Sequence, residues 1–132
     1  MKRALKILGA MLAVAFVVFG LAMIPVLREA RTQATVTRTK VLLQAVRSAC
    51  ITYSNYYGEW PRSLPDLTHN KSNVVFMEWG AEGASDSWGR PLVFKRFSSA
   101  SGFGSIGSYG RDGRTGGEGP DADIEVRFGD AK

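Results

Sequence analysis

An uncharged run near the start of the chain most constrains what it can fold into. The residues from Ile7 to Leu27 include no charged side chain. A helix rises about 1.5 Å per residue, so this run is long enough to cross about 30 Å of hydrocarbon. A cleaved signal peptide is the alternative, although its apolar region is usually about 7–15 residues and ends at a small-residue cleavage site. We therefore expect residues 1–27 to form a basic leader and a transmembrane helix.

The charges divide between this leader and the rest of the chain. The net charge is +5, and Lys2, Arg3 and Lys6 contribute three of it, which leaves +2 on residues 28–132. The remaining basic residues are mixed with acidic ones, whereas a nucleic-acid surface needs them clustered, so we expect no nucleic-acid partner. The basic leader favours a cytoplasmic N-terminus, with the C-terminal domain on the other side of the membrane.

The residues that catalysis or zinc binding would need are scarce. The chain has one cysteine, Cys50, and one histidine, His69, which excludes an internal disulfide and a cysteine-rich or histidine-rich zinc site. There is no paired nucleophile and base, so we predict that the protein is not an enzyme. Cys50 is expected to be a small apolar residue on a helix face.

A helical rhythm continues beyond the apolar run. Small and apolar residues recur at three- or four-residue spacing, with one longer gap, and this predicts that residues 28–57 form the exposed half of one long helix. The residues of this stripe are Ala30, Ala34, Val41, Ala45, Ala49, Tyr53 and Tyr56. Pro25 is expected to kink the helix without ending it, and Gly58 and Pro61 are expected to stop it.

The remainder is predicted to be a connecting region followed by a small sheet. Residues 58–90 form an α/β connecting loop region, with one helical turn at 63–67 and a short strand or packing plug at 74–79. Residues 91–132 form an antiparallel sheet with three strands at 91–97, 103–109 and 124–128, and a hairpin loop at 98–102. The expected fold class is α+β, with residues 28–132 as one globular domain.

The glycine-rich loop from Ser108 to Ile124 is the strongest candidate site. Asp112, Asp121 and Asp123 supply carboxylates, which suit calcium, and the glycines let backbone carbonyls turn inward. Residues 112–130 include six acidic side chains and two basic ones, so the three aspartates would repel one another without a cation. The alternative is a solvated loop that binds no ion. An EF-hand is excluded because the loop has no flanking helices and its ligand positions do not match. A dinucleotide site at 102–107 is excluded because those glycines are not part of a βαβ unit.

Three motifs together resemble one known family. They are the segments 53–61 (YSNYYGEWP), 85–92 (SDSWGRPL) and 108–124, and they resemble the major pseudopilin of the type II secretion system, within the type IV pilin-like superfamily. The resemblance implies a calcium-stabilised subunit in the bacterial inner membrane, single-pass, with a periplasmic domain. It implies contacts with other pseudopilin or pilin subunits through the N-terminal helix, with the lipid bilayer and with inner-membrane proteins of the secretion system.

The resemblance also carries residue roles. By position, Asp112 and Asp123 match the family's calcium-binding side chains, Asp121 matches approximately, and the carbonyl of Tyr109 falls where a backbone ligand is expected. Asp86 and Trp88 match a structural turn of the family, with Ser87 in place of its proline.

The amino end departs from the family pattern. With Pro25 aligned to the family's helix proline, Arg3 stands at the glycine that prepilin peptidase cuts after, and Leu8 at the glutamate that follows. This departure leaves two functions open. One is a structural pseudopilin subunit of a type II secretion or type IV pilus-like machine. The other is an unprocessed, permanently anchored pilin-fold binding or accessory domain that does not polymerise.

Overall fold

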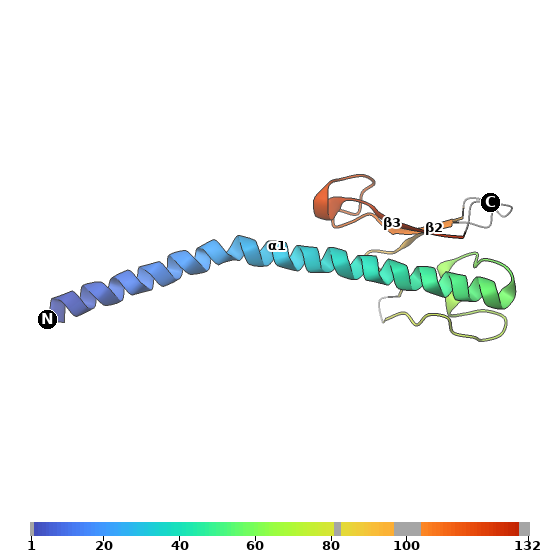
Figure 1. Cartoon of the computed structure of the whole chain (residues 1–132), viewed down its shortest axis with the longest axis horizontal. Helices are drawn as coiled ribbons and strands as arrows, with labels where there is room; N and C mark the ends of the chain where they lie inside the picture. The colour runs from blue at the N-terminus through green and yellow to red at the C-terminus, as the bar shows by residue number, and fades with distance from the viewer. Residues whose placement is uncertain (1, 81–82, 97–103, 130–132) are drawn as a thin grey trace. The chain divides into compact units, whose positions relative to one another are not determined.

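A computed structural model describes residues 2–80, 83–96 and 104–129, without the side chains of residues 2–10 and 13. The fold is α+β and comprises one long helix, two short 3-10 helices and three strands (Figure 1). In chain order these are α1 (Lys2–Tyr57), η1 (Leu64–Leu67), β1 (Val93–Arg96), β2 (Gly104–Ser108), η2 (Gly119–Asp121) and β3 (Ile124–Phe128). The chain divides into two compact units, residues 1–34 and 35–132.

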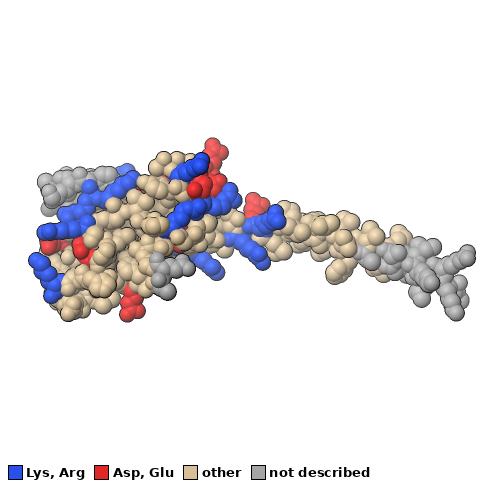
Figure 2. Space-filling model, turned by 180° about the vertical axis from the view of Figure 1, so that it is seen from behind, with Lys and Arg blue, Asp and Glu red and all other residues tan. Residues whose placement is uncertain are grey.

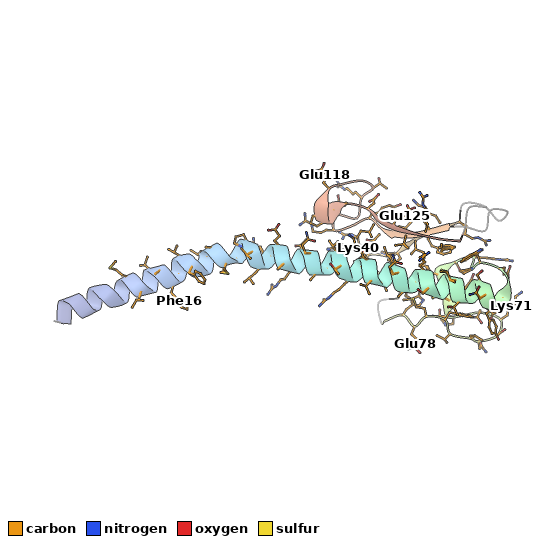
Figure 3. All side chains as sticks on the ribbon, viewed as in Figure 1. Phe16, Lys40, Lys71, Glu78, Glu118 and Glu125 are labelled. Carbon is orange, nitrogen blue, oxygen red and sulfur yellow. The ribbon has the colours of Figure 1, made fainter. Side chains whose placement is uncertain are left out.

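The first unit consists of α1 residues with their apolar side chains in solvent. Phe16 is 82% exposed, and every other large apolar side chain described from Met11 to Leu27 is at least 39% exposed. Figure 3 labels Phe16, whose side chain projects from the helix. Among the described residues, no helix combines the length and hydropathy that a bilayer crossing requires. The predicted long helix is observed, and Pro25 lies inside it without ending it. That this helix crosses a membrane stays a prediction.

The second unit is built around the later turns of α1. Thr39, Leu43, Val46 and Cys50 are fully buried, at three- or four-residue spacing. The predicted stripe was partly wrong, because Val41 is 63% exposed and Ala45 is also on the solvent side. Longer side chains at 43 and 46 fill the space against the sheet better than the alanines do, and they set which face turns inward.

The predicted place of Cys50 is confirmed. Its side chain is fully buried in the core, and burial raises the pKa of the thiol to about 12. The helix ends as predicted at Tyr57. Gly58 adopts a left-handed conformation with φ of 71°, and its N–H donates to the Ser54 carbonyl at 2.9 Å, which closes the last turn.

The three strands form the predicted antiparallel sheet in the order β1-β2-β3. Phe94, Ile106 and Val126 align across it, and the ring of Phe94 stacks on that of Phe128 at 5.4 Å between centroids. The Arg47 guanidinium on α1 donates from Nε to the Arg127 carbonyl on β3 at 2.9 Å, which ties the helix to the edge of the sheet. Residue 97, the predicted hairpin loop at 98–102 and residue 103 lie outside the described residues.

The connecting region contributes to the core without forming a strand at 74–79. Its predicted helical turn is the 3-10 helix η1, whose Leu64 and Leu67 are buried. The Phe76 N–H donates to the Leu67 carbonyl at 2.8 Å, and Phe76, Met77 and Trp79 pack partly buried against the core. Of the two predicted alternatives for this segment, the packing plug is therefore the one observed.

Candidate metal-binding loop

The loop between β2 and β3 is folded upon itself. It runs from Tyr109 to Asp123 and includes the short helix η2 (Figure 1). The Arg111 N–H donates to the Pro120 carbonyl at 2.9 Å, and the Asp123 N–H donates to the Gly116 carbonyl at 3.2 Å. These two backbone bonds join the outgoing and returning halves, so the loop has a defined path although most of it is exposed.

Two glycines let the backbone close around Asp121. Gly110 has φ of 64°, and a Cβ there would lie 2.8 Å from the carbonyl oxygens of Asp121 and Ala122. Gly117 has φ of 82°, and a Cβ there would collide with the Asp121 carbonyl oxygen. Both positions therefore require glycine for conformation and for space, and they form a cradle on either side of Asp121.

The Asp121 carboxylate is paired with Arg111. The guanidinium donates from Nε to Oδ1 and from Nη2 to Oδ2, each at 2.8 Å. The Asp121 side chain is 29% exposed and that of Arg111 is 54% exposed. The hydrogen bonds from Arg111 hold the pKa of the Asp121 carboxyl below its usual value, and the positive charge of Arg90 acts in the same direction. A bidentate pair of this kind fixes the plane of the carboxylate.

The other two predicted ligands bind backbone N–H groups within the loop. Asp112 accepts from the Arg114 N–H through Oδ1 at 3.0 Å, and Asp123 accepts from the Gly116 N–H through Oδ2 at 3.0 Å. Both side chains are exposed. Within the part of the chain that the structure describes, no three His, Cys, Asp or Glu residues gather in a metal-binding arrangement. The three aspartates are thus brought onto one loop, but not into one cluster.

The fourth predicted ligand lies at the start of the loop. Tyr109 directly follows β2 and is half-buried, and the Lys95 ammonium lies 5.9 Å from the centroid of its ring. Glu118 is at the outer edge of the loop and Glu125 is on β3 (Figure 3). The face in Figure 2 has basic and acidic side chains side by side in this region.

A buried carboxylate anchors the entrance of the loop. Asp86 is 5% exposed, and its Oδ1 accepts the N–H groups of Trp88 and Arg90, both at 2.9 Å. Its Oδ2 accepts the hydroxyl of Ser108 at 2.5 Å, and the Ser108 oxygen in turn accepts the Gly110 N–H at 3.2 Å. The predicted structural turn at Asp86 is therefore also the support of the glycine where the loop begins, a link that the sequence pattern did not indicate.

Arg90 and Arg111 are the site residues that sequence reasoning missed. Arg90 donates from Nη1 to the Gly110 carbonyl at 3.4 Å, and its side chain packs against Gly113. Arg111 could have been found from the sequence, since it immediately precedes Asp112. The charge count began at residue 112 and so left Arg111 out. The Asp121 carboxylate therefore lies in the field of two guanidinium groups that the count did not include.

The predicted ligands are of the chemical type that a hard divalent cation prefers, but among the described residues the three aspartates do not gather around one point. All three predicted side-chain ligands offer carboxylate oxygens, the donor type that a hard cation prefers, and the carbonyl oxygens that approach Gly110 and Gly117 are those of Asp121 and Ala122. The Arg111 guanidinium already places a positive charge on that carboxylate. Asp112, Asp121, Asp123 and the Tyr109 carbonyl would hold such an ion, whose contribution would be to tie the loop together rather than to activate a reactant.

The fold and this loop together define a class of protein. A long α1 helix on a three-stranded antiparallel sheet, with a glycine-rich loop before the last strand, is the architecture of pilin-like subunits. The family model described as type II secretion system (T2SS), protein G matches residues 26–127, and the chain belongs to this family of major pseudopilins. A comparison with curated proteins found no match to the chain.

Proposed function

We propose that the chain is a structural subunit of a type II secretion or type IV pilus-like machine and has no catalytic activity of its own. The family match over residues 26–127 carries this proposal. Under this proposal, the N-terminus is cytoplasmic, α1 anchors the chain in the bacterial inner membrane, and the globular domain is periplasmic.

The exposed apolar surface of the first unit supports an anchoring and assembly role. Burying one large apolar side chain is worth about 1.5–3 kcal/mol, so a helix with many of them in solvent gains strongly from cover. The first unit exposes such side chains from Met11 to Leu27. Lipid covers them in a single anchored subunit, and the helices of other subunits cover them after assembly, together with contacts to inner-membrane proteins of the machine.

A charged side chain introduced into this apolar surface tests whether the surface anchors the chain in the membrane. We expect the full chain expressed in bacteria to stay in the membrane fraction after alkaline carbonate washing, and Phe16→Lys to be released several-fold more. Val75→Lys is the matched control, since Val75 is also an exposed apolar residue, at 55%, but lies in the second unit. Release of the unmodified chain by carbonate, or equal release of both variants, would remove the anchoring claim.

The second part of the proposal is that calcium stabilises the periplasmic domain. The side chains of Asp112, Asp121 and Asp123 and the carbonyl of Tyr109 bind the ion, and the bound loop holds β3 in place. A ligand that binds only the folded chain raises its stability, by about 2.7 kcal/mol when present at one hundred times its dissociation constant.

Thermal unfolding with calcium and with a chelator tests this part. We expect the full chain to melt at a higher temperature in calcium, and Asp123→Asn to lose most of that difference. Glu118→Gln is the control, because it removes an exposed acid of the same loop that is outside the proposed ligand set. Equal melting temperatures of the unmodified chain in calcium and in chelator would refute the calcium proposal.

A second function remains in view because of Arg3 and Leu8. These residues stand where the family has its cleavage-site glycine and its helix glutamate, and this favours an unprocessed, permanently anchored accessory domain that does not polymerise. The mass of the chain purified from membranes separates the two functions. An intact Met1 or Lys2 without filaments supports the accessory domain, whereas a shortened, N-methylated chain in filaments supports the pseudopilin.

A further inference from the structure

We propose that a cavity beside the last turns of α1 is a binding site for a neutral polyhydroxylated ligand, a short saccharide. The cavity has a volume of about 480 Å³, within the range of small-molecule sites, about 300–1,000 Å³. Its walls come from the end of α1 and from the segment 59–73 that follows, all within the second unit. Figure 3 labels one of the lining residues, Lys71, near the end of α1. The site is separate from the loop between β2 and β3.

Tyr53 is the most deeply buried residue that lines the cavity, with 8% of its surface exposed. Its ring packs against those of Tyr57 and Phe76, with centroids 4.6 and 5.3 Å away. Burial raises the pKa of the Tyr53 hydroxyl, and the nearby carboxylates of Asp66 and Glu59 raise it further. Both carboxylates line the cavity, so the hydroxyl faces into it.

The Tyr53 hydroxyl has no hydrogen-bond partner among the described residues. A tyrosine buried to this degree usually pairs its hydroxyl with a protein group. Tyr57 shows the usual arrangement, because its hydroxyl donates to Oδ1 of Asn70 at 2.7 Å. Tyr53 therefore offers one donor and one acceptor to a ligand in the cavity.

Hydrogen bonds fix the wall of the cavity. Asn70 donates from Nδ2 to the Val74 carbonyl at 2.6 Å and accepts the Val74 N–H through Oδ1 at 3.2 Å. The Asp66 carboxylate accepts the N–H groups of Arg62 and Ser63 at 2.7 and 3.1 Å. These bonds hold the lining segment in one path, so little ordering is needed when a ligand binds.

The charged side chains that line the cavity balance each other. Glu59 and Asp66 are negative, whereas Arg62 and Lys71 are positive. Glu59 and Arg62 form a pair at 3.9 Å, with side chains 60% and 79% exposed, and so exposed a pair is weak enough for both groups to bind a ligand. A phosphate or a metal ion would meet charges of its own sign as well as opposite ones, so the lining favours neither.

A sugar ring matches this combination of groups. Its hydroxyls both donate and accept, so they pair with carboxylates, with the Arg62 guanidinium and with the Tyr53 hydroxyl. Its C–H face is apolar and packs on an aromatic ring, such as that of the half-buried Tyr57. A peptide fits less well, because the described lining offers an apolar side chain the two tyrosine rings alone.

Titration of the full chain with neutral disaccharides tests the inference. The chain is kept in a phosphocholine detergent, because a sugar-headed detergent would compete for the site. Maltose, cellobiose and N,N′-diacetylchitobiose are the probes, and saturation-transfer NMR follows their binding. We expect at least one of them to bind with a Kd of about 1 mM or lower, and tetraglycine and inorganic phosphate to bind at least about tenfold more weakly.

Two tyrosine variants place the binding in this cavity. Tyr53→Phe removes the hydroxyl and keeps the ring in the core, and we expect it to weaken binding about tenfold. Tyr56→Phe is the matched control, since it removes the same group from a tyrosine that is 61% exposed and outside the cavity lining. It should change the affinity by less than about twofold. Without saccharide, Tyr53→Phe should melt within about 2 °C of the unmodified chain, because its hydroxyl has no protein partner to lose.

Saccharide binding that Tyr53→Phe weakens and Tyr56→Phe does not supports the site. Absence of binding by all three disaccharides up to about 10 mM overturns it, as does equal weakening by the two variants. Tighter binding of tetraglycine or phosphate than of every disaccharide overturns the saccharide as the ligand. A clearly lower melting temperature of Tyr53→Phe without saccharide would show that the hydroxyl serves the fold, and this also overturns the inference.

Discussion

Asp86 and Asp121 are two carboxylates that serve the same loop in opposite ways. Asp86 is 5% exposed and accepts from neutral donors, two backbone N–H groups and one hydroxyl. Asp121 is 29% exposed and accepts both its hydrogen bonds from one guanidinium. A buried carboxylate with fixed short-range donors cannot give them up without large cost, whereas an exposed one with a mobile cation can trade it. Burial and the kind of donor, rather than the residue type, therefore separate a structural anchor from a partner in a surface ion pair.

The largest expected effect comes from removing the anchor. Asp86→Ala leaves the N–H groups of Trp88 and Arg90 and the Ser108 hydroxyl without their acceptor in a buried site. Each such donor costs about 1–3 kcal/mol, so we expect the free energy of unfolding to fall by about 4 kcal/mol. Urea denaturation of the full chain followed by circular dichroism measures it. Asp112→Ala, which removes an exposed carboxylate, should cost far less, and similar losses for the two would erase the contrast.

The next effect tests the cradle around Asp121. Gly117→Ala adds a Cβ against the Asp121 carbonyl oxygen at φ of 82°, and we expect a loss of about 2–3 kcal/mol. Gly116→Ala is the matched control, since Gly116 also has positive φ, 95°, but no atom lies within 4 Å of its added Cβ. It should show only the conformational part, about 1 kcal/mol. Denaturant midpoints of the two variants separate strain from collision, and equal losses would contradict a closed cradle.

A smaller effect is expected from the hydroxyl that joins the anchor to the loop. Ser108→Ala removes the donor to Asp86 and the acceptor of the Gly110 N–H, which should lower the free energy of unfolding by about 1–2 kcal/mol. Combining it with Asp86→Asn measures the coupling, since residues in one network give non-additive effects. Strictly additive losses would show that the two side chains act independently.

The smallest effect is a pH dependence from Asp121. The Arg111 hydrogen bonds hold the pKa of this carboxyl below its value in the unfolded chain, so the folded state binds fewer protons as the medium is acidified. The resulting stability is fully present above the unfolded-state pKa, about 3.9, and is lost as the pH falls through the lower folded value. Melting curves between about pH 5 and 2 should show a slightly smaller acid-induced loss for Asp121→Asn than for the unmodified chain. An equal acid-induced loss in the two chains would mean that the pair does not form in solution.

Features set by local sequence pattern could be predicted from the sequence, whereas features set by contacts between distant residues could not. The positions of the helix, the three strands and the loop follow from local periodicity and turn residues. The predicted boundaries agree with the structure to within one or two residues at Tyr57, at the start of β1, at the end of β2 and at both ends of β3. The buried face of α1 was harder to predict from the sequence, because packing against the rest of the domain decides that Thr39 and Leu43 are buried. The partners of Asp86 and Asp121 could not be predicted from sequence spacing. Ser108 belongs to a different segment of the chain from Asp86, and Arg111 reaches Asp121 across the folded loop.

The contact between Trp60 and Phe128 has a practical consequence for all of these measurements. Their ring centroids lie 5.3 Å apart, and Phe128 is the last residue of β3, the strand that the loop leads into. A change in how that strand docks alters the surroundings of the Trp60 indole. In a chain whose other two tryptophans, Trp79 and Trp88, are replaced by phenylalanine, the emission of Trp60 can therefore report how β3 docks without any added label.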